Sequence, residues 1–141
     1  MRAPSPFDPK NSPEEASLPV CRVAVIHNPV AGWRRRRYLR RVIDALRERG
    51  CEVRLRRTTA PGDAHAFAAE AEGCDVLAVA GGDGTVNEAL NGLAGRHVPL
   101  SVIPLGTANV LAHELGLPRR PVALARAIVE GRCVPVCIWE R

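Results

Sequence analysis

The chain has 141 residues, a length that suits one folded domain with one hydrophobic core. It contains 46% hydrophobic and 25% charged residues, a balance that excludes collagen-like, fibrous and wholly disordered proteins. Its formal net charge is +5, and Lys10 is the single lysine among the 20 basic residues. No apolar run approaches the roughly 20 residues that a transmembrane helix needs, so no membrane-spanning segment is predicted.

The N-terminal segment and the cysteines indicate the compartment. Residues 1–20 are rich in proline, serine and charged side chains and lack the apolar core of a secretory signal, so we expect a flexible tail and a cytoplasmic protein. The cysteines are odd in number and form neither a Cys-x-x-Cys pair nor a zinc-binding spacing. We therefore predict apolar packing, with no disulfide or metal, for Cys21, Cys51, Cys74, Cys133 and Cys137.

From residue 22 onward, short apolar runs alternate with helical periodicity, which is typical of βα units around a parallel sheet. The predicted strands are 22–27, 51–55, 76–80, 100–103 and a last one near 133–138. The predicted helices are 38–50, 63–72 with Asp63 as N-cap, 86–93, 107–115 and 121–131. The third strand is expected at the sheet centre and the second, half-buried, near an edge. The fold class is therefore α/β, an open, Rossmann-like three-layer sandwich with a mainly parallel sheet.

A glycine-rich segment, Gly-Gly-Asp-Gly-Thr-Val-Asn-Glu at 81–88, lies where the central strand passes into a helix. A helix N-terminus at this edge offers unpaired N–H groups, and glycines let the backbone approach a phosphate. The segment is not a P-loop, because no Gly-Lys-Ser/Thr follows, nor a G-x-G-x-x-G fingerprint, because Asn87 replaces the third glycine. Asp83 would repel a phosphate there unless Mg²⁺ or a hydroxyl lay between them. A simpler interpretation is a glycine turn with a capping box between Thr85 and Glu88.

Two more motifs follow strands, namely Asn-Pro-Val-Ala-Gly at 28–32 and Pro-Leu-Gly-Thr-Ala-Asn at 104–109. The three motifs, in this order, resemble the catalytic domain of the diacylglycerol kinase family, specifically the bacterial lipid kinases. The resemblance extends from residue 22 to the C-terminus and implies the ATP-binding domain fold of lipid kinases and NAD kinases. It also implies ATP and Mg²⁺ at the glycine-rich turn, with the γ-phosphoryl group passed to a lipid hydroxyl such as that of diacylglycerol.

The resemblance also implies the roles of individual residues. Asp83 is the expected catalytic residue, and no metal ligands are assigned. Nucleotide contacts are implied for Asn28, Thr58, Gly82, Gly84, Thr85, Asn87, Glu88 and Thr107. Thr59 is a substitute for Thr58, and Asn109 is also expected to contact a ligand. Simpler interpretations are a strand-exit turn at Asn28 and a strand end at Thr58.

Six arginines crowd into residues 34–41, here called the arginine segment: Arg34, Arg35, Arg36, Arg37, Arg40 and Arg41. The cluster fits either a solvated helix face or attraction to phosphate or anionic lipid. Nucleic acid is not an expected partner, because Trp33 and Tyr38 are the only aromatic residues nearby. Since the family's substrate is a lipid, the resemblance implies a lipid partner and peripheral contact with the inner face of a membrane.

The resemblance assigns residues 21–141 to the nucleotide-binding catalytic domain. Relatives continue into a β-rich domain that forms the lipid pocket and supplies a carboxylate base, and this domain is expected to be absent here. Besides a lipid kinase domain, we consider a nucleotide-binding fragment with little or no turnover and a basic surface-binding protein. An NAD kinase-like enzyme is a further alternative, although the motif at 104–109 resembles the lipid branch better.

Overall fold

The computed structural model describes residues 21–131, the side chain of Trp33 excepted. The strands in this range are β1 (Arg22–His27), β2 (Glu52–Arg57), β3 (Val76–Gly81) and β4 (Leu100–Pro104). They form one sheet in the order β2-β1-β3-β4, and every neighbouring pair is parallel. The predicted tail at 1–20 and the predicted strand near 133–138 lie outside the described residues.

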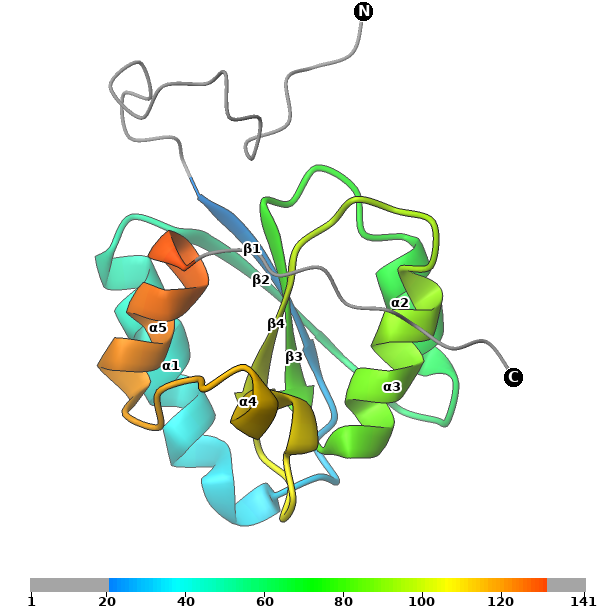
Figure 1. Cartoon of the computed structure of the whole chain (residues 1–141), viewed down its shortest axis with the longest axis horizontal. Helices are drawn as coiled ribbons and strands as arrows, with labels where there is room; N and C mark the ends of the chain where they lie inside the picture. The colour runs from blue at the N-terminus through cyan, green and yellow to red at the C-terminus, as the bar shows by residue number, and fades with distance from the viewer. Residues whose placement is uncertain (1–20, 132–141) are drawn as a thin grey trace, which may run out of the picture.

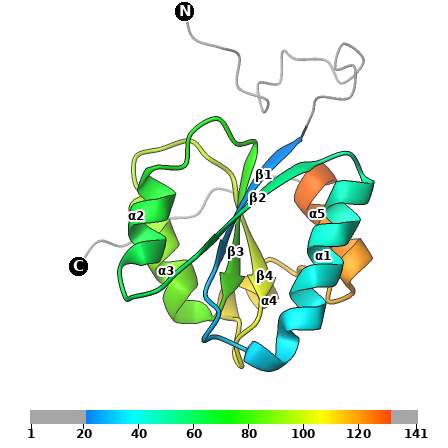
Figure 2. The ribbon, with the colours of Figure 1, turned by 180° about the vertical axis from the view of Figure 1, so that it is seen from behind.

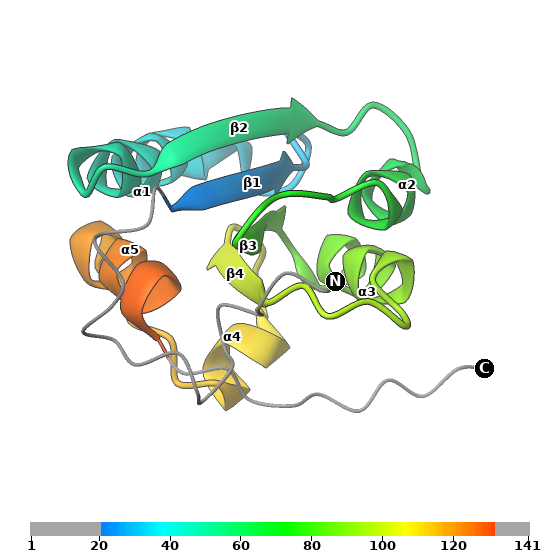
Figure 3. The same cartoon turned by 90° about the horizontal axis from the view of Figure 1, so that it is seen from above.

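Helices cover both faces of the sheet. Their bounds are α1 (Arg36–Glu48), preceded by the 3-10 turn η1 (Trp33–Arg35), α2 (Asp63–Ala69), α3 (Asp83–Gly92), α4 (Val110–Glu114) and α5 (Pro121–Glu130). Helices α1 and α5 lie on one face and α2 and α3 on the other, as Figures 1 and 3 show. The rear view in Figure 2 shows the same layers. The predicted three-layer α/β sandwich is thus confirmed.

The core consists of two clusters, one on each face of the sheet. Strand β3 is buried along its whole length, as expected of a central strand covered on both faces. On β1, the side chain of Val25 packs with α1 and α5, whereas that of Ile26 packs with α2 and α3. The sheet therefore holds both helix pairs through the alternation of side chains along its strands. Within residues 21–131, no helix is long and apolar enough to span a bilayer.

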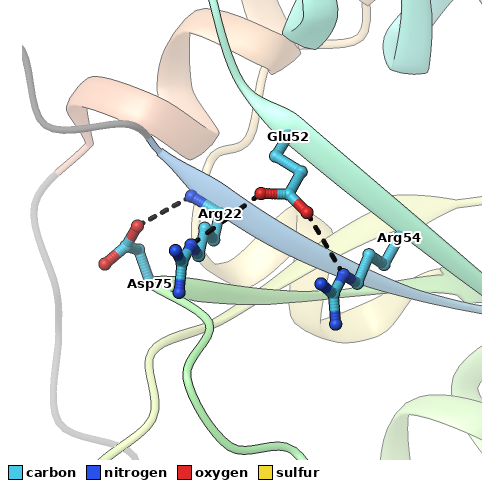
Figure 4. A network of polar contacts seen from close by, with 4 residues as sticks. All are labelled: Arg22, Glu52, Arg54 and Asp75. Atoms are coloured by element: carbon cyan, nitrogen blue, oxygen red, sulfur yellow. Dashed lines mark hydrogen bonds and ion pairs between the residues drawn. The ribbon is translucent and has the colours of Figure 1, made fainter.

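A polar network closes the amino ends of the strands (Figure 4). The backbone N–H of Arg22 donates to the Asp75 carboxylate at 2.7 Å. The Arg22 guanidinium lies 3.8 Å from the Glu52 carboxylate. Glu52 also accepts from Arg54 on the same strand at 3.3 Å. These contacts lie at the end of the sheet opposite the sequence motifs.

Several predicted details are wrong. The second strand lies at the sheet edge as predicted, but it is mostly exposed instead of half-buried, because β2 is the outermost strand and the helices cover it only in part. The second helix stops at Ala69, short of residue 72, and Gly62 is its N-cap. Asp63 is instead the first helical residue, and its carboxylate binds the preceding loop. The helix predicted at 107–115 begins only at Val110.

The described cysteines, Cys21, Cys51 and Cys74, are free thiols. Cys51 is buried in the core, and Cys21 lies beside it at the start of the neighbouring strand. Burial and the hydrogen bond to Cys51 raise the pKa of Cys21 to about 12, so its thiol stays protonated at neutral pH. The positions of Cys21 and Cys51 agree with their predicted role as apolar packing, whereas Cys74 is outside both core clusters.

Candidate functional site

The strand order places a reversal of winding between β1 and β3. The chain leaves β1 through α1 on one face and returns to β3 through α2 on the other, so the winding direction reverses between these two neighbours. In open α/β sheets, ligands bind at such a reversal. Residue His27 pairs with Ala80 across the two strands, and the backbone N–H of Asn28 donates to the Ala80 carbonyl at 3.0 Å. The loops after β1 and β3 are therefore held side by side.

A side-chain hydrogen bond joins these two loops. The Asn28 Nδ2 donates to the Thr85 Oγ1 at 3.0 Å, and the Asn28 Oδ1 accepts from the backbone N–H of Val30 at 3.1 Å. Thr85 is buried and lies inside α3, where the N-cap is Gly82, so it is not the capping residue that the Thr-x-x-Glu pattern predicted. The capping box is wrong because both of its members bind other segments of the chain.

Glu88, the other member of that pattern, holds the loop between β2 and α2. Its Oε1 accepts from the backbone N–H of Gly62 at 2.5 Å. Within this loop the Asp63 carboxylate accepts from the backbone N–H and hydroxyl of Thr59, at 2.7 and 3.0 Å, and from the backbone N–H of Ala60. These bonds, first of all the one from the Thr59 backbone, lower the pKa of Asp63. Thr58 follows β2, and its backbone N–H donates to the His27 carbonyl at 2.9 Å.

Two glycines allow the loops after β3 and β4 to touch. A Cβ added at Gly106 would lie 2.7 Å from the Gly82 Cα. Two carbon atoms cannot come this close unless one of the two loops moves. The N–H of Leu105 also donates to the Gly81 carbonyl at 3.1 Å. This contact brings the glycine-rich turn against the motif at 104–109, so both motifs form one surface.

Asn109 shapes the second of these loops. It is the one described non-glycine residue with positive φ, at 51°, and it is buried. Its Oδ1 accepts from the Gly106 N–H at 3.0 Å, and its Nδ2 donates to the Gly106 carbonyl at 2.8 Å. Both polar ends of the side chain are thus used inside the turn, although a ligand contact was expected from the sequence.

Asp83 opens α3 and bridges to α4. Its Oδ1 accepts from the backbone N–H of Val110 at 2.8 Å, while its Oδ2 has no hydrogen-bond partner within residues 21–131. The first N–H groups of an α-helix have no intrahelical acceptor, and the N-cap Gly82 supplies no side chain to accept from those of α3. The turn therefore presents backbone donors beside a carboxylate with one free oxygen.

The remaining predicted residues surround this turn. Gly84 and Asn87 are exposed on α3, and a Cβ added at Gly84 would meet nothing within 4 Å. Thr107 is exposed in the loop after β4. The structure thus gathers the predicted residues from four loops at one edge of the sheet. Thr59 differs, because Asp63 already binds its hydroxyl.

Two residues that the sequence analysis gave no site role support this edge. Gly32, at φ 60°, lies so close to the loop after β4 that an added Cβ would overlap the Leu105 carbonyl. Its place in the motif at 28–32 was the available signal. His27 ends β1 with its Nδ1 buried and unpartnered in the described region. Burial, and after it the positive charges of Arg57 and Arg36, lower the pKa of His27. The imidazole at the end of β1 is therefore neutral at neutral pH.

Comparison with known proteins identifies the class. Residues 22–140 match the diacylglycerol kinase catalytic domain, and the chain therefore belongs to this family. A curated diacylglycerol kinase of Bacillus subtilis is 37% identical over 125 residues, covering 84% of this chain and 41% of the relative. One from Mycobacterium tuberculosis is 49% identical over 76 residues, covering 50% and 25%.

A probable YegS-like lipid kinase of Klebsiella pneumoniae is 38% identical over 104 residues, covering 71% of this chain and 35% of the relative. Among solved structures, a diacylglycerol kinase from Bacillus anthracis superposes with a TM-score of 0.69 at 32% identity, covering 79% of this chain and 42% of that one. The chain thus spans about two fifths or less of the length of these relatives.

Proposed function

We propose that this chain is the nucleotide-binding part of an ATP-dependent lipid kinase that transfers the γ-phosphoryl group to a lipid hydroxyl such as that of diacylglycerol. The observation that carries the proposal is the contact between the glycine-rich turn and the motif at 104–109, where Gly106 closes on Gly82. It supplies backbone donors from two loops and a helix N-terminus at the edge where α/β sheets bind phosphates. Family membership supports the kinase class.

In this proposal the backbone of Gly82 to Thr85 binds the phosphates. Asn28 does not need to touch the nucleotide, because its bond to Thr85 fixes the position of the loop after β1 against α3. Glu88 acts in the same way on the loop that carries Thr58. Thr58, Asn87 and Thr107 lie at the rim and contact the remainder of the nucleotide. Phosphoryl transfer depends mainly on such positioning and on neutralisation of charge.

Asp83 suits a magnesium ion bound together with the nucleotide. Magnesium sites of this kind use one or two carboxylates and complete the shell with phosphates and water. Asp83 has one oxygen anchored to Val110 and one free, which fits such a site, whereas residues 21–131 contain no group of three or more carboxylate, histidine or cysteine ligands. When bound, the ion would offset the negative charge on the phosphates.

The decisive binding experiment is an ATP titration by calorimetry, in the presence of Mg²⁺, of the wild type and of Gly84→Val. The new side chain meets no protein atom within 4 Å at its Cβ, so a loss of affinity reports on ligand space rather than on misfolding. Asn91→Val, an exposed β-branched substitution farther along α3, is the matched control. We expect a loss of roughly tenfold or more for Gly84→Val and none for the control. Equal affinities in all three proteins would exclude this turn as the phosphate site.

Turnover is a separate question, because the relatives are longer than this chain. We propose that the acceptor lipid is aligned in part by residues beyond this length, and that a protein extended with a relative's remaining sequence transfers phosphate to diacylglycerol much faster. Asp83→Asn should remove that gain while keeping the backbone phosphate donors. The assay is radiolabelled phosphate transfer to lipid in mixed micelles. Full activity of the 141-residue chain would place the whole acceptor site within these residues.

The arginine segment suits a membrane surface, where each basic residue contributes about 1 kcal/mol near anionic lipid. It follows a loop that exposes an apolar side chain, since Val30 is 84% exposed. We propose that this combination brings the domain to the bilayer that holds its lipid substrate. Replacing residues 34–37 with serine should weaken binding to anionic vesicles at low salt and leave ATP affinity unchanged. Unchanged vesicle binding would make the segment an ordinary solvated helix face.

A further inference from the structure

A surface pocket of about 380 Å³ lies between the first turns of α1 and the segment that leads into α5. Its lining residues are Arg37, Tyr38, Arg41, Arg119, Arg120 and Pro121. Arg37 and Arg41 are four residues apart and share one face of α1. Arg119 and Arg120 immediately precede Pro121, the first residue of α5. Helices α1 and α5 lie side by side (Figures 1 and 3). Four arginines from two distant parts of the chain therefore line one pocket.

The four pocket arginines lack carboxylate partners among the described residues, whereas the arginines at the other end of the same helix pair are ion-paired. There the Arg49 guanidinium contacts the Glu130 carboxylate at 3.2 Å, and Arg126 contacts it at 3.0 Å. The α1–α5 pair thus carries an ion-pair cluster at its carboxyl ends and uncompensated positive charge at its amino ends. A concentration of like charges with no internal partner favours an anion from solution.

Two further features of the pocket suit an anion. Helix α5 has 10 residues, no acidic residue in its first turn and no side-chain cap, so its first free N–H groups and its dipole add positive potential. Tyr38 lines the pocket as well, and its buried hydroxyl has no hydrogen-bond partner in the described region.

We propose that this pocket is a binding site for a phosphomonoester group. The planar forks of arginine match phosphate oxygens in pairs, and a dianionic monoester accepts more such bonds than a phosphodiester with its single charge. The site shares no residue with the set proposed for the nucleotide. Arg37 and Arg41 also belong to the arginine segment, and the inference goes beyond the proposed function by assigning them, with Arg119 and Arg120, to one phosphate group. Its ligand is either a dissolved phosphate ester or the headgroup of a phosphorylated lipid in a membrane.

The test compares the wild type, Arg41→Gln and Arg119→Gln with Arg40→Gln, an exposed position on α1 that does not line the pocket. Inorganic phosphate is titrated at constant ionic strength and followed by the NMR signal of the Val122 amide in the first turn of α5. In parallel, the proteins are sedimented with phosphatidylcholine vesicles that contain either phosphatidate or phosphatidylglycerol, matched in surface potential. ATP affinity is measured on every variant.

We expect saturable phosphate binding that each pocket variant weakens roughly tenfold and that Arg40→Gln preserves. Preference for phosphatidate vesicles, reversed by inorganic phosphate, would identify the lipid headgroup as the ligand. Phosphate binding without vesicle preference would identify a dissolved ester. Equal losses for Arg40→Gln and the pocket variants would reduce the effect to diffuse charge and overturn the proposal. It would also be overturned by the absence of saturable binding, or by an equal loss of ATP affinity, which would make the pocket part of the nucleotide site.

Discussion

The Asn28 amide and the Thr85 hydroxyl, 57 positions apart in the sequence, are joined by a 3.0 Å hydrogen bond across the ends of β1 and β3. This bond crosses the point where the sheet changes its direction of winding, and it lies partly buried beneath the glycine-rich turn. Among the described residues, it is the one hydrogen bond between side chains that links the motif at 28–32 to the motif at 81–88. The candidate site therefore depends on a contact that each motif alone does not contain.

Replacing Asn28 with alanine should lower the free energy of unfolding by about 1–3 kcal/mol, because the buried Thr85 hydroxyl and the Val30 N–H both lose a partner. Urea unfolding measures the change. Asn91→Ala, at an exposed asparagine of α3, is the control and should leave the stability nearly unchanged. If both variants unfold at the same urea concentration, the Asn28 bond contributes nothing to the fold.

Gly106→Ala should destabilise the protein by about 1–3 kcal/mol, since the new methyl group would lie 2.7 Å from the Gly82 Cα and backbone must move to relieve the overlap. Gly84→Ala is the matched comparison, because its methyl group meets nothing within 4 Å. We expect the alanine at Gly84 to leave stability unchanged or slightly raised. Denaturant unfolding of the two variants side by side is the measurement, and equal stabilities would disprove the close approach of the two loops.

Asn109 combines an unusual backbone conformation with two side-chain bonds, and paired substitutions separate these contributions. Asn109→Gly tolerates the positive φ of 51° but loses both bonds to Gly106, whereas Asn109→Ala loses the bonds and also strains the backbone. We therefore expect the alanine variant to be less stable than the glycine variant by about 1 kcal/mol in thermal or urea unfolding. The reverse order would show that the left-handed conformation is not required.

Stability should fall in mildly acidic solution because of His27. Its pKa in the folded protein is lowered below 6.5, so protonation favours the unfolded chain, in which the imidazole titrates normally. The contribution of His27 is complete above pH 6.5 and is lost as the pH falls through its folded-state pKa. Unfolding free energies of the wild type and His27→Gln, measured across this range, should converge on acidification. A difference that is constant with pH would contradict a buried, neutral imidazole.

The sequence by itself determined the elements and the fold class, because each βα unit carries a local signal. The apolar run at 76–80 forms the buried strand β3. Helix α5 begins at Pro121 and is capped at its C-terminus by Gly131, as predicted. The order of motifs also identified the family, which the comparison confirmed. Such features depend on residues close together in the chain, whose periodicity and turn chemistry can be recognised without knowing the neighbours in space.

Only the tertiary structure decided what the polar residues of the motifs do. The Thr85–Glu88 spacing is a valid local capping pattern, yet Thr85 binds Asn28 and Glu88 binds the loop at Gly62. The pocket arginines also come together only in the folded chain. No sequence pattern assigned a role to Arg119 and Arg120, which lie far from α1 along the chain. A polar side chain bonds to whichever partner the packed sheet brings within reach, and that partner lies on another strand or helix. Its identity therefore depends on strand order and register, which local sequence patterns do not encode.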